Sequence, residues 1–220
     1  MVGDNLKNLY EKLPSAVKLV AVSKLHPVAR LMEAYDAGQR VFGENRPQEL
    51  AAKVPQMPPD VEWHFIGHLQ TNKLKLVLPY VSLVQSVDSV HLLEAIDKWG
   101  SDNGRVIDVL LELHLGAEET KHGFSEEEIV AIVNTAGERA SHIRIRGLMG
   151  MATNTEDEGV IEADFARIEA LFKWIREEYP ELRDTFTELS IGMSGDWPIA
   201  VRHGATMVRI GTDIFGEREY

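Results

Sequence analysis

Residues 18–24 read Lys-Leu-Val-Ala-Val-Ser-Lys, an apolar run that ends in a lysine and is followed at once by Leu25-His26-Pro27. Branched side chains in a run of this length are typical of a buried strand. Lys24 then stands at the carboxyl end of the strand, just before a helix. Burial lowers the pKa of an amine and makes it nucleophilic toward carbonyl groups, but a lysine at a strand end also commonly extends its charge into water. Both interpretations of Lys24 remain open on this stretch alone.

Runs of the same kind recur along the chain, separated by segments with helical periodicity. The other strand candidates are residues 40–44, 61–66, 83–86, 106–115, 143–149, 188–192 and 207–210. The helical candidates are residues 4–13, 27–37, 47–54, 71–78, 90–99, 125–140, 158–179 and 198–203. This alternation predicts an α/β protein with a parallel sheet, and eight strands fit a single closed (β/α)8 barrel, the TIM barrel, over residues 1–220. An open doubly wound sheet is the alternative.

Cap and turn residues agree with these boundaries. Pro27 and Pro198 suit the first turns of helices, and Gly38 suits the end of one. Ser125 and Glu128 form the pattern of a capping box, which predicts that a helix begins there.

The composition is that of an ordinary globular protein, with 44% hydrophobic and 26% charged residues. The net charge of −12 argues against nucleic acid or an anionic membrane surface as a partner. The chain has no cysteine, which excludes a disulfide framework and thiolate chemistry. Residues 1–12 are polar and charged, and no apolar run has the length of a membrane span, so we expect a cytoplasmic protein.

Polar or reactive residues fall at or just past several predicted strand ends. They are Lys24, Asn45, His68, Met149 and Ser194. The active sites of (β/α)8 barrels lie at the carboxyl ends of the strands. We therefore expect these five side chains on one face of the molecule.

Small residues near the last two strands indicate an anion site. Residues 192–195, with the Ser194 hydroxyl, run into a helix start, and Gly204-Ala205-Thr206 leads into the last strand. Exposed N–H groups and a helix dipole attract anions, and barrels often bind phosphate near strands seven and eight. The alternative is a set of plain turn glycines, with Asp196 stabilising the helix start.

The last strand carries a charged residue. Alternation places Arg209 and Gly211 on one face, opposite the two aliphatic residues of the strand. The aliphatic face should meet the helices, so Arg209 should point into the barrel. A buried arginine needs an acceptor, either a carboxylate such as Glu62 or Glu112 or a bound ligand.

The histidines give weaker signals. His64 lies within a strand, and we expect a core histidine with satisfied hydrogen bonds. His68 lies at a strand tip, where it can reach a ligand or serve as a plain loop residue. The histidines and carboxylates show no metal-ligand spacing such as His-Glu-x-x-His, so we predict no metal. Dinucleotide, Walker and nucleophile-elbow patterns are also absent.

Seven segments, in order and with suitable spacing, resemble the pyridoxal phosphate homeostasis proteins, also called alanine racemase N-terminal-domain-like proteins. The segments are residues 21–24 (Ala-Val-Ser-Lys), 42–45 (Phe-Gly-Glu-Asn), 64–73, 86–89 (Ser-Val-Asp-Ser), 146–149 (Arg-Gly-Leu-Met), 190–196 and 208–216. The resemblance spans almost the whole chain. Three departures concern the pocket rim: Arg46-Pro47 replaces an aromatic–aliphatic pair, Gln85 stands where a histidine is usual, and His114 replaces an asparagine.

The resemblance implies a fold-type III barrel that binds pyridoxal 5′-phosphate (PLP) as an aldimine with Lys24. It also implies that Arg209 faces the pyridine nitrogen, and that Ser194 holds the phosphate together with Gly204, Ala205 and Thr206.

Further residues complete the expected cofactor site. The resemblance places Asn45 and Met149 near the ring. We add His68 for its position at a strand tip, and Gly211 because it shares a strand face with Arg209.

The expected role is that of a carrier rather than an enzyme. An arginine stays protonated, so the pyridine nitrogen it faces accepts a hydrogen bond and the ring is a weak electron sink. Alanine racemases share this arginine but add a C-terminal β domain with a tyrosine, and we expect no such domain after the last strand. We therefore expect a monomeric PLP carrier in vitamin B6 homeostasis, with no catalytic residue and with PLP-requiring apo-enzymes as recipients.

Two other functions stay open on the sequence. One is a weak PLP-dependent amino-acid racemase. The other is an aldolase-type Schiff-base lyase that binds a phosphosugar and no cofactor. A second, transient PLP site on Lys73 or Lys121 is a further question that the sequence leaves open.

Overall fold

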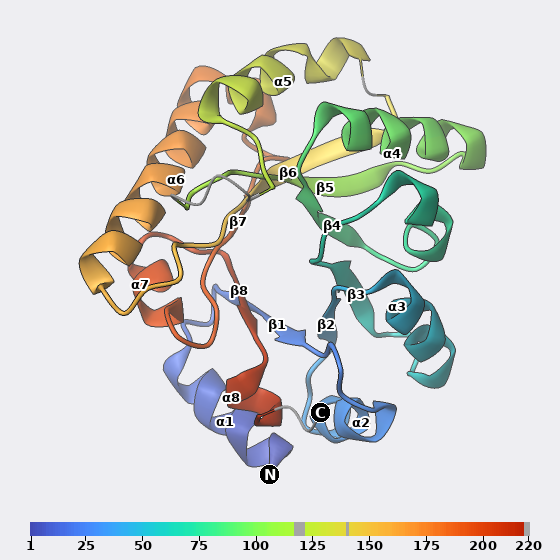
Figure 1. Cartoon of the computed structure of the whole chain (residues 1–220), viewed down its shortest axis with the longest axis vertical. Coiled ribbons are helices and arrows are strands. Elements are labelled where there is room, and N and C mark those ends of the chain that lie inside the picture. The colour runs from blue at the N-terminus through green and yellow to red at the C-terminus, as the bar shows by residue number, and fades with distance from the viewer. Residues whose placement is uncertain (117–121, 140, 218–220) are drawn as a thin grey trace.

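The computed structural model describes residues 1–116, 122–139 and 141–217. Its strands are parallel and pair in chain order, and the last strand also pairs with the first, which closes a barrel (Figure 1). The strands are β1 (Lys18–Val22), β2 (Val41–Glu44), β3 (Glu62–Phe65), β4 (Leu83–Val87), β5 (Ile107–Glu112), β6 (Ile143–Met149), β7 (Glu188–Ser190) and β8 (Met207–Ile210). The predicted (β/α)8 barrel is therefore confirmed, and the open sheet is wrong.

The helices surround the barrel (Figure 1). The α-helices are α1 (Val2–Lys12), α2 (Val28–Asp36), α3 (Pro47–Lys53), α4 (Val90–Asn103), α5 (Glu126–Arg139), α6 (Glu158–Glu178), α7 (Trp197–Arg202) and α8 (Thr212–Phe215). Three 3-10 helices, η1 (Val54–Gln56), η2 (Thr71–Leu76) and η3 (Pro180–Leu182), complete the ring. In the described part of the chain, no helix is long and apolar enough to cross a membrane.

Helix ends follow the cap residues of the sequence. At the start of α5 the Glu128 N–H donates to Ser125 Oγ at 3.2 Å, and the Ser125 N–H donates to Glu128 Oε2 at 2.8 Å. This is the predicted capping box. Gly38, just past α2, has φ 101°, and Gly104, which caps α4, has φ 61°, conformations that glycine adopts without strain.

The helices η2 and α8 are among the elements that differ from the predictions. Residues 71–76 form the 3-10 helix η2 rather than an α-helix, and Leu74 is its one buried residue. So little buried apolar surface gives an α-helix no packed face to stabilise it. The four-residue helix α8 was not predicted, because a segment of that length is too short to show a helical period.

Apolar side chains fill the inside of the barrel as well as the layer between strands and helices. The interior cluster consists of Val20, Leu83, Leu110, Met149 and Met207, all less than a tenth exposed. The barrel is therefore a packed core rather than a pore, and a ligand has to bind at one of its ends.

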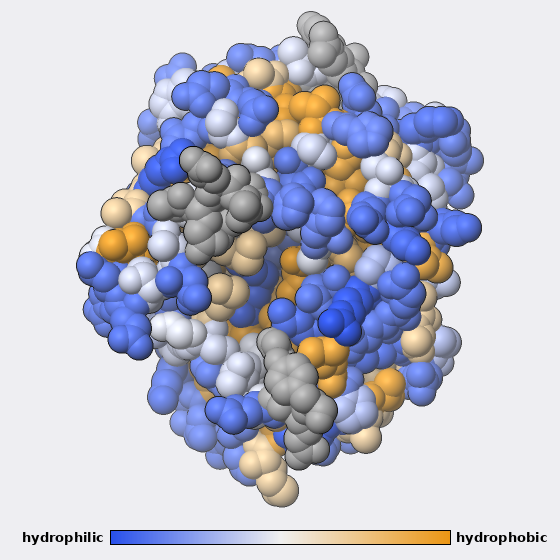
Figure 2. Space-filling model, in the orientation of Figure 1, coloured by the Kyte–Doolittle hydropathy of each residue, from blue (hydrophilic) through white to orange (hydrophobic). Residues whose placement is uncertain are grey.

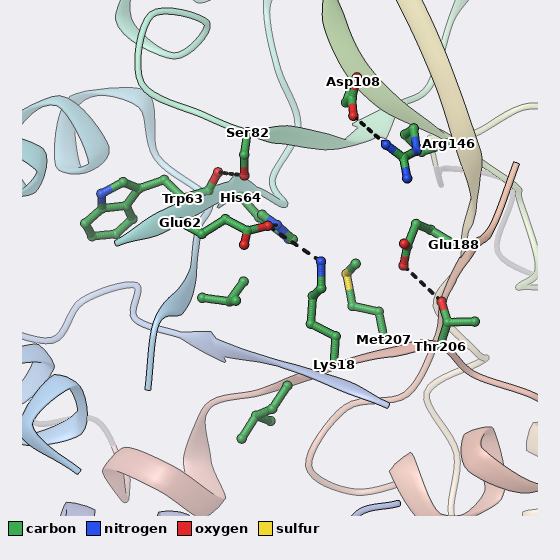
Figure 3. A network of polar contacts seen from close by, with 12 residues as sticks. Lys18, Glu62, Trp63, His64, Ser82, Asp108, Arg146, Glu188, Thr206 and Met207 are labelled. Carbon is green, nitrogen blue, oxygen red and sulfur yellow. Dashed lines mark hydrogen bonds and ion pairs between the residues drawn. The ribbon is translucent and has the colours of Figure 1, made fainter. Parts of the chain in front are cut away.

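Polar side chains line the amino-terminal ends of the strands (Figure 3). Lys18 Nζ lies 3.6 Å from Glu62 Oε1, and His64 Nε2 lies 2.9 Å from the same oxygen. Gln85 Nε2 donates to His64 Nδ1 at 2.8 Å, so both nitrogens of this fully buried ring have partners. The prediction of a satisfied core histidine is confirmed. Burial lowers the pKa of His64, and the hydrogen bond with His64 lowers the pKa of Glu62 to about 2.

Candidate functional site

The carboxyl-terminal ends of the strands gather residues that the sequence singled out. Lys24 follows β1, Asn45 follows β2, Ser194 lies just past β7, and Gly211 follows β8. Gly211 lies against β1, because a Cβ placed on it would be 3.2 Å from Val22 O. Figure 2 looks onto this end of the barrel and shows a hollow at its centre.

The backbone on both sides of Lys24 is held by hydrogen bonds from its neighbours. Ser23 Oγ donates to Glu44 Oε1 at 2.6 Å. Leu25 has φ 65°, which is uncommon for a residue other than glycine, and its N–H donates to Glu49 Oε1 at 2.6 Å. Strained residues of this kind persist only where their surroundings fix them, so the turn that carries Lys24 is tightly defined.

Lys53, at the end of α3, joins the groups that fix this turn. Its Nζ donates to Ser23 O at 2.8 Å, to Glu44 Oε1 at 2.7 Å and to Glu49 Oε1 at 2.6 Å. The Lys53 side chain is 7% exposed and that of Glu44 is fully buried. Burial raises the pKa of the Glu44 carboxyl, and Lys53 opposes that rise. Lys53 is thus a buried counter-ion that also holds the carbonyl of Ser23, the residue before Lys24.

Arg209 points into the barrel, as strand parity predicts, and is 4% exposed. Its Nη1 donates to Ser190 O and Ser190 Oγ at 2.7 Å each, and its Nη2 donates to Gly150 O at 2.9 Å. Among the described residues it forms no ion pair with Glu62 or Glu112, so of the two acceptors that the sequence left open, a carboxylate or a ligand, the carboxylate is wrong. Two carbonyls and a hydroxyl accept these bonds instead, and Glu62 is paired with Lys18 and His64 at the other end of the barrel.

A chain of hydrogen bonds connects Arg209 with the far end of the barrel. Ser190 Oγ accepts from Arg209 and donates to Gln85 Oε1 at 2.7 Å, and Gln85 in turn donates to His64. Burial lowers the pKa of Arg209 to about 10, with the charges of Glu112 and Asp196 acting in the opposite direction. The guanidinium therefore stays protonated at neutral pH, and its position is fixed before any ligand binds.

Glu112, the last residue of β5, is a second buried charge at this end. Burial is the main cause that raises the pKa of its carboxyl to about 7. The charge of Asp88 adds to the rise and that of Arg209 opposes it.

We expect Glu112→Gln to stabilise the protein at neutral pH. The folded pKa of about 7 exceeds the ordinary 4.5, so the stability that protonated Glu112 contributes is fully present below 4.5 and is lost as the pH rises to about 7. The variant has no such loss. Its free energy of unfolding relative to the native sequence should rise by about 2–3 kcal/mol between about pH 5 and pH 8, as measured by urea denaturation. An equal effect of pH on both proteins would contradict this pKa.

Asn45 carries an unsatisfied polar atom. Its Oδ1 is buried and has no hydrogen-bond partner among the described residues. Gly67 packs closely on Asn45, since a Cβ on Gly67 would lie 2.4 Å from Asn45 O. A buried acceptor without a donor is costly, so this atom marks a position where a ligand donor would be stabilising.

Ser194 lies in a tight turn between β7 and α7. Gly192 has φ 94°, and a Cβ there would lie 2.6 Å from Ala200 Cβ, so only glycine fits. The Met193 N–H donates to Asp196 Oδ1 at 2.5 Å, and the Arg209 N–H donates to Gly192 O at 2.9 Å. The turn is thereby attached to β8 and holds a half-buried Ser194.

Comparison with known proteins places this chain among sequences that share the whole fold. The alanine racemase N-terminal domain family matches residues 2–219. The pyridoxal phosphate homeostasis protein of Haemophilus influenzae is 37% identical over all of this chain and 97% of its own length. That of Homo sapiens is 37% identical over all of this chain and 87% of its own length. The chain belongs to the pyridoxal phosphate homeostasis protein family.

Solved structures agree with this membership. PipY of Synechococcus elongatus, a COG0325 family member, is 38% identical and covers 98% of this chain and 100% of its own. Its TM-score is 0.92 for the structure without PLP and 0.90 for the structure with PLP bound. An alanine racemase of Clostridium difficile has a TM-score of 0.77 at 14% identity and covers 57% of its own chain, which shows the shared fold alone.

Three residues predicted for this homeostasis-family site lie elsewhere. Gly204, Ala205 and Thr206 precede β8 and therefore lie at the amino-terminal ends of the strands. There Thr206 O accepts the Lys18 N–H at 2.8 Å, and Thr206 Oγ1 donates to Glu188 Oε2 at 3.1 Å (Figure 3). Their assignment to the phosphate is wrong, because a loop that leads into a strand lies at the opposite end of the barrel from the loops that leave the strands, where Lys24 and Ser194 lie.

The remaining predicted residues lie at or next to the end that carries Lys24. Met149 is 1% exposed, belongs to the interior cluster and directly precedes Gly150, whose carbonyl accepts from Arg209. The His68 side chain is 46% exposed, and its Nδ1 lies 2.8 Å from Asp88 Oδ2. Of the two lysines considered for a second site, Lys73 lies in η2 and Lys121 lies outside the described residues.

Sequence reasoning did not single out two residues at this end of the barrel. Thr212 follows Gly211 directly after β8, so the rule that active sites lie at the carboxyl ends of the strands makes it a candidate too. The burial of Lys53 could not be predicted in this way, because a lysine on a helix is usually exposed to solvent.

Proposed function

We propose that this chain binds PLP at the carboxyl-terminal end of the barrel, with Lys24 as the bonding amine, and carries it in vitamin B6 homeostasis in the cytoplasm. The observation that supports this most directly is the placement of Lys24 on the same barrel end as the inward, permanently charged Arg209. Membership of the homeostasis family and the PLP-bound structure of PipY support the same ligand.

The residues present suit the chemical groups of PLP. The cofactor would supply an aldehyde that condenses with a primary amine and releases water. Lys24 is the amine at this end, and Arg209, which is only a donor, suits the pyridine nitrogen as an acceptor. The orphaned Asn45 Oδ1 suits a ligand donor. Ser194 and the Gly211–Thr212 turn, from the loops after β7 and β8, would bind the phosphate.

A carrier role fits the site better than catalysis. An unprotonated pyridine nitrogen opposite Arg209 makes the ring a weak electron sink, which disfavours carbanion chemistry. We assign no catalytic residue, and the likeness to alanine racemases concerns the fold alone. The carrier would act as a monomer and pass PLP to apo-enzymes that require it. Catalytic turnover of an enantiopure amino acid that depends on Lys24 would contradict the carrier role.

The amine assignment is tested by Lys24→Ala. The native protein with PLP should be yellow, borohydride should bleach the colour, and peptide mass spectrometry should find the reduced adduct on Lys24. The variant should lose the adduct entirely because no primary amine replaces Lys24, while Lys73→Ala, a matched loss of a lysine from the same end of the barrel, should keep it. An adduct that persists in Lys24→Ala, or a native protein that stays colourless with PLP, would refute the proposed site.

A further inference from the structure

Three side chains from separate loops converge at the end of the barrel that carries Lys24. His68 follows β3, Asp88 follows β4, and His122 stands two residues before Phe124, which pairs with Leu113 just past β5. Their potential ligand atoms all lie within 4.8 Å of one another. Both His68 Nδ1, at 2.8 Å, and His122 Nδ1, at 3.5 Å, approach the same oxygen, Asp88 Oδ2. The two imidazole rings stack with centroids 4.1 Å apart.

We propose that His68, Asp88 and His122 form a binding site for a divalent transition-metal ion, for which zinc is the best match. Two imidazole nitrogens and one carboxylate oxygen are a donor set that zinc accepts, with the fourth position left to water or another ligand. Zinc–ligand bonds of about 2.0–2.1 Å in a tetrahedron separate two ligand atoms by about 3.4 Å. The observed separations of 2.8 Å and 3.5 Å lie on either side of that value.

The backbone holds the three ligands in place. Phe124, two residues after His122, forms a bridge with Leu113 next to β5. Its N–H donates to Glu112 O at 2.8 Å, and its carbonyl accepts from the His114 N–H at 2.9 Å. The segment that bears His122 is therefore fixed to the barrel, as the residues next to β3 and β4 are. Ligands on fixed elements lose little freedom when an ion binds.

The charges around the cluster also favour a cation. The Asp88 side chain is only 6% exposed. A carboxylate with so little access to water gains from a divalent ion beside it. The prediction of no metal rested on the spacing of ligands along the chain, whereas these ligands are 20 and 34 residues apart and meet only in the closed barrel.

Zinc binding to the untagged protein, by equilibrium dialysis with metal analysis, tests the proposal. We expect one equivalent of zinc, and cobalt in its place should give visible absorption bands of a nitrogen- and oxygen-bound ion. His122→Ala and Asp88→Asn should each weaken binding more than about 100-fold, above the effect typical of residues that only support a ligand. His142→Ala, at the other end of the barrel, should bind zinc as the native protein does.

The outcomes separate this proposal from that of PLP binding. The His122 side chain is 61% exposed, so His122→Ala should fold normally even where Asp88→Asn does not. Zinc binding should persist in Lys24→Ala without PLP, which keeps the two proposals independent. A native protein that binds no zinc at micromolar concentration, or binding that His122→Ala leaves unchanged, would overturn the proposal and leave a plain hydrogen-bonded cluster.

Discussion

Lys53→Met is expected to lower the free energy of unfolding by about 3–5 kcal/mol, the usual result of removing one partner from a buried ion pair. Lys53 Nζ is the counter-ion of Glu44 and Glu49, and the Glu44 side chain is fully buried. Without the ammonium group, a carboxylate remains in a region that water does not reach. Equilibrium denaturation with urea, followed by circular dichroism, measures the loss.

The pH dependence of that loss identifies its cause. Burial already raises the pKa of Glu44 and Lys53 lowers it, so the variant should raise it further. A carboxyl whose folded pKa is raised stabilises the fold below its unfolded pKa and loses that contribution as the pH rises. The destabilisation of Lys53→Met should therefore grow from mildly acidic to alkaline pH. The double variant Lys53→Met/Glu44→Gln, which has no charge at position 44, should recover part of the stability and lose this pH dependence.

A surface lysine provides the matched control. Lys98 pairs with Asp102 one helical turn away, and both side chains are well exposed. Lys98→Met should cost at most about 0.5 kcal/mol. The role that we assign to Lys53 is wrong if both variants lose the same small amount. Because Lys53 also holds the Ser23 carbonyl next to Lys24, Lys53→Met should in addition slow formation of the PLP adduct, whereas Lys98→Met should not.

The difference between these two lysines shows what sequence can and cannot predict here. The strands were predictable because apolar, branched runs alternate with helical periods, and each reactive residue next to a strand end could be assigned to one end of the barrel. Lys53 and Lys98 both occur in helical segments and look alike in sequence. Only the contact of α3 with the ends of β1 and β2 buries Lys53 against Glu44.

The misplaced phosphate residues have a different cause. Gly204 and Thr206 are small residues of the kind that form anion sites, and they adjoin β8. Phosphate sites in barrels lie after the strand, however, and these residues lie before it. Composition does not distinguish the loop that enters a strand from the loop that leaves it, and strand direction does. Gly211 and Thr212, which come after β8, have both the residue types of an anion site and the position at the carboxyl-terminal end of the strand.

Arg209→Met is expected to lower the free energy of unfolding by about 3 kcal/mol and to impair PLP binding. The guanidinium satisfies the carbonyls of Ser190 and Gly150 and the Ser190 hydroxyl. Ser190 O keeps the Gly150 N–H as a donor, but Gly150 O and Ser190 Oγ lose the donor that Arg209 supplies. Each buried acceptor left without a donor costs about 1–3 kcal/mol, and the flexible methionine recovers part of that by filling the space. Arg202, which pairs with Glu162 on the surface, is the control, and Arg202→Met should change stability by less than about 1 kcal/mol.

Arg209→Lys separates charge from geometry at the same position. Lysine keeps the positive charge but lacks the planar fork that reaches Ser190 and Gly150 together, so it should restore only part of the stability. The pKa of Glu112 reports whether position 209 carries a positive charge, because the charge of Arg209 lowers that pKa. Glu112 should therefore titrate at higher pH in Arg209→Met and near its native pH in Arg209→Lys, as followed by NMR. If Arg209→Met leaves the titration of Glu112 unchanged, the two charges do not interact, and the arginine acts through its hydrogen bonds alone.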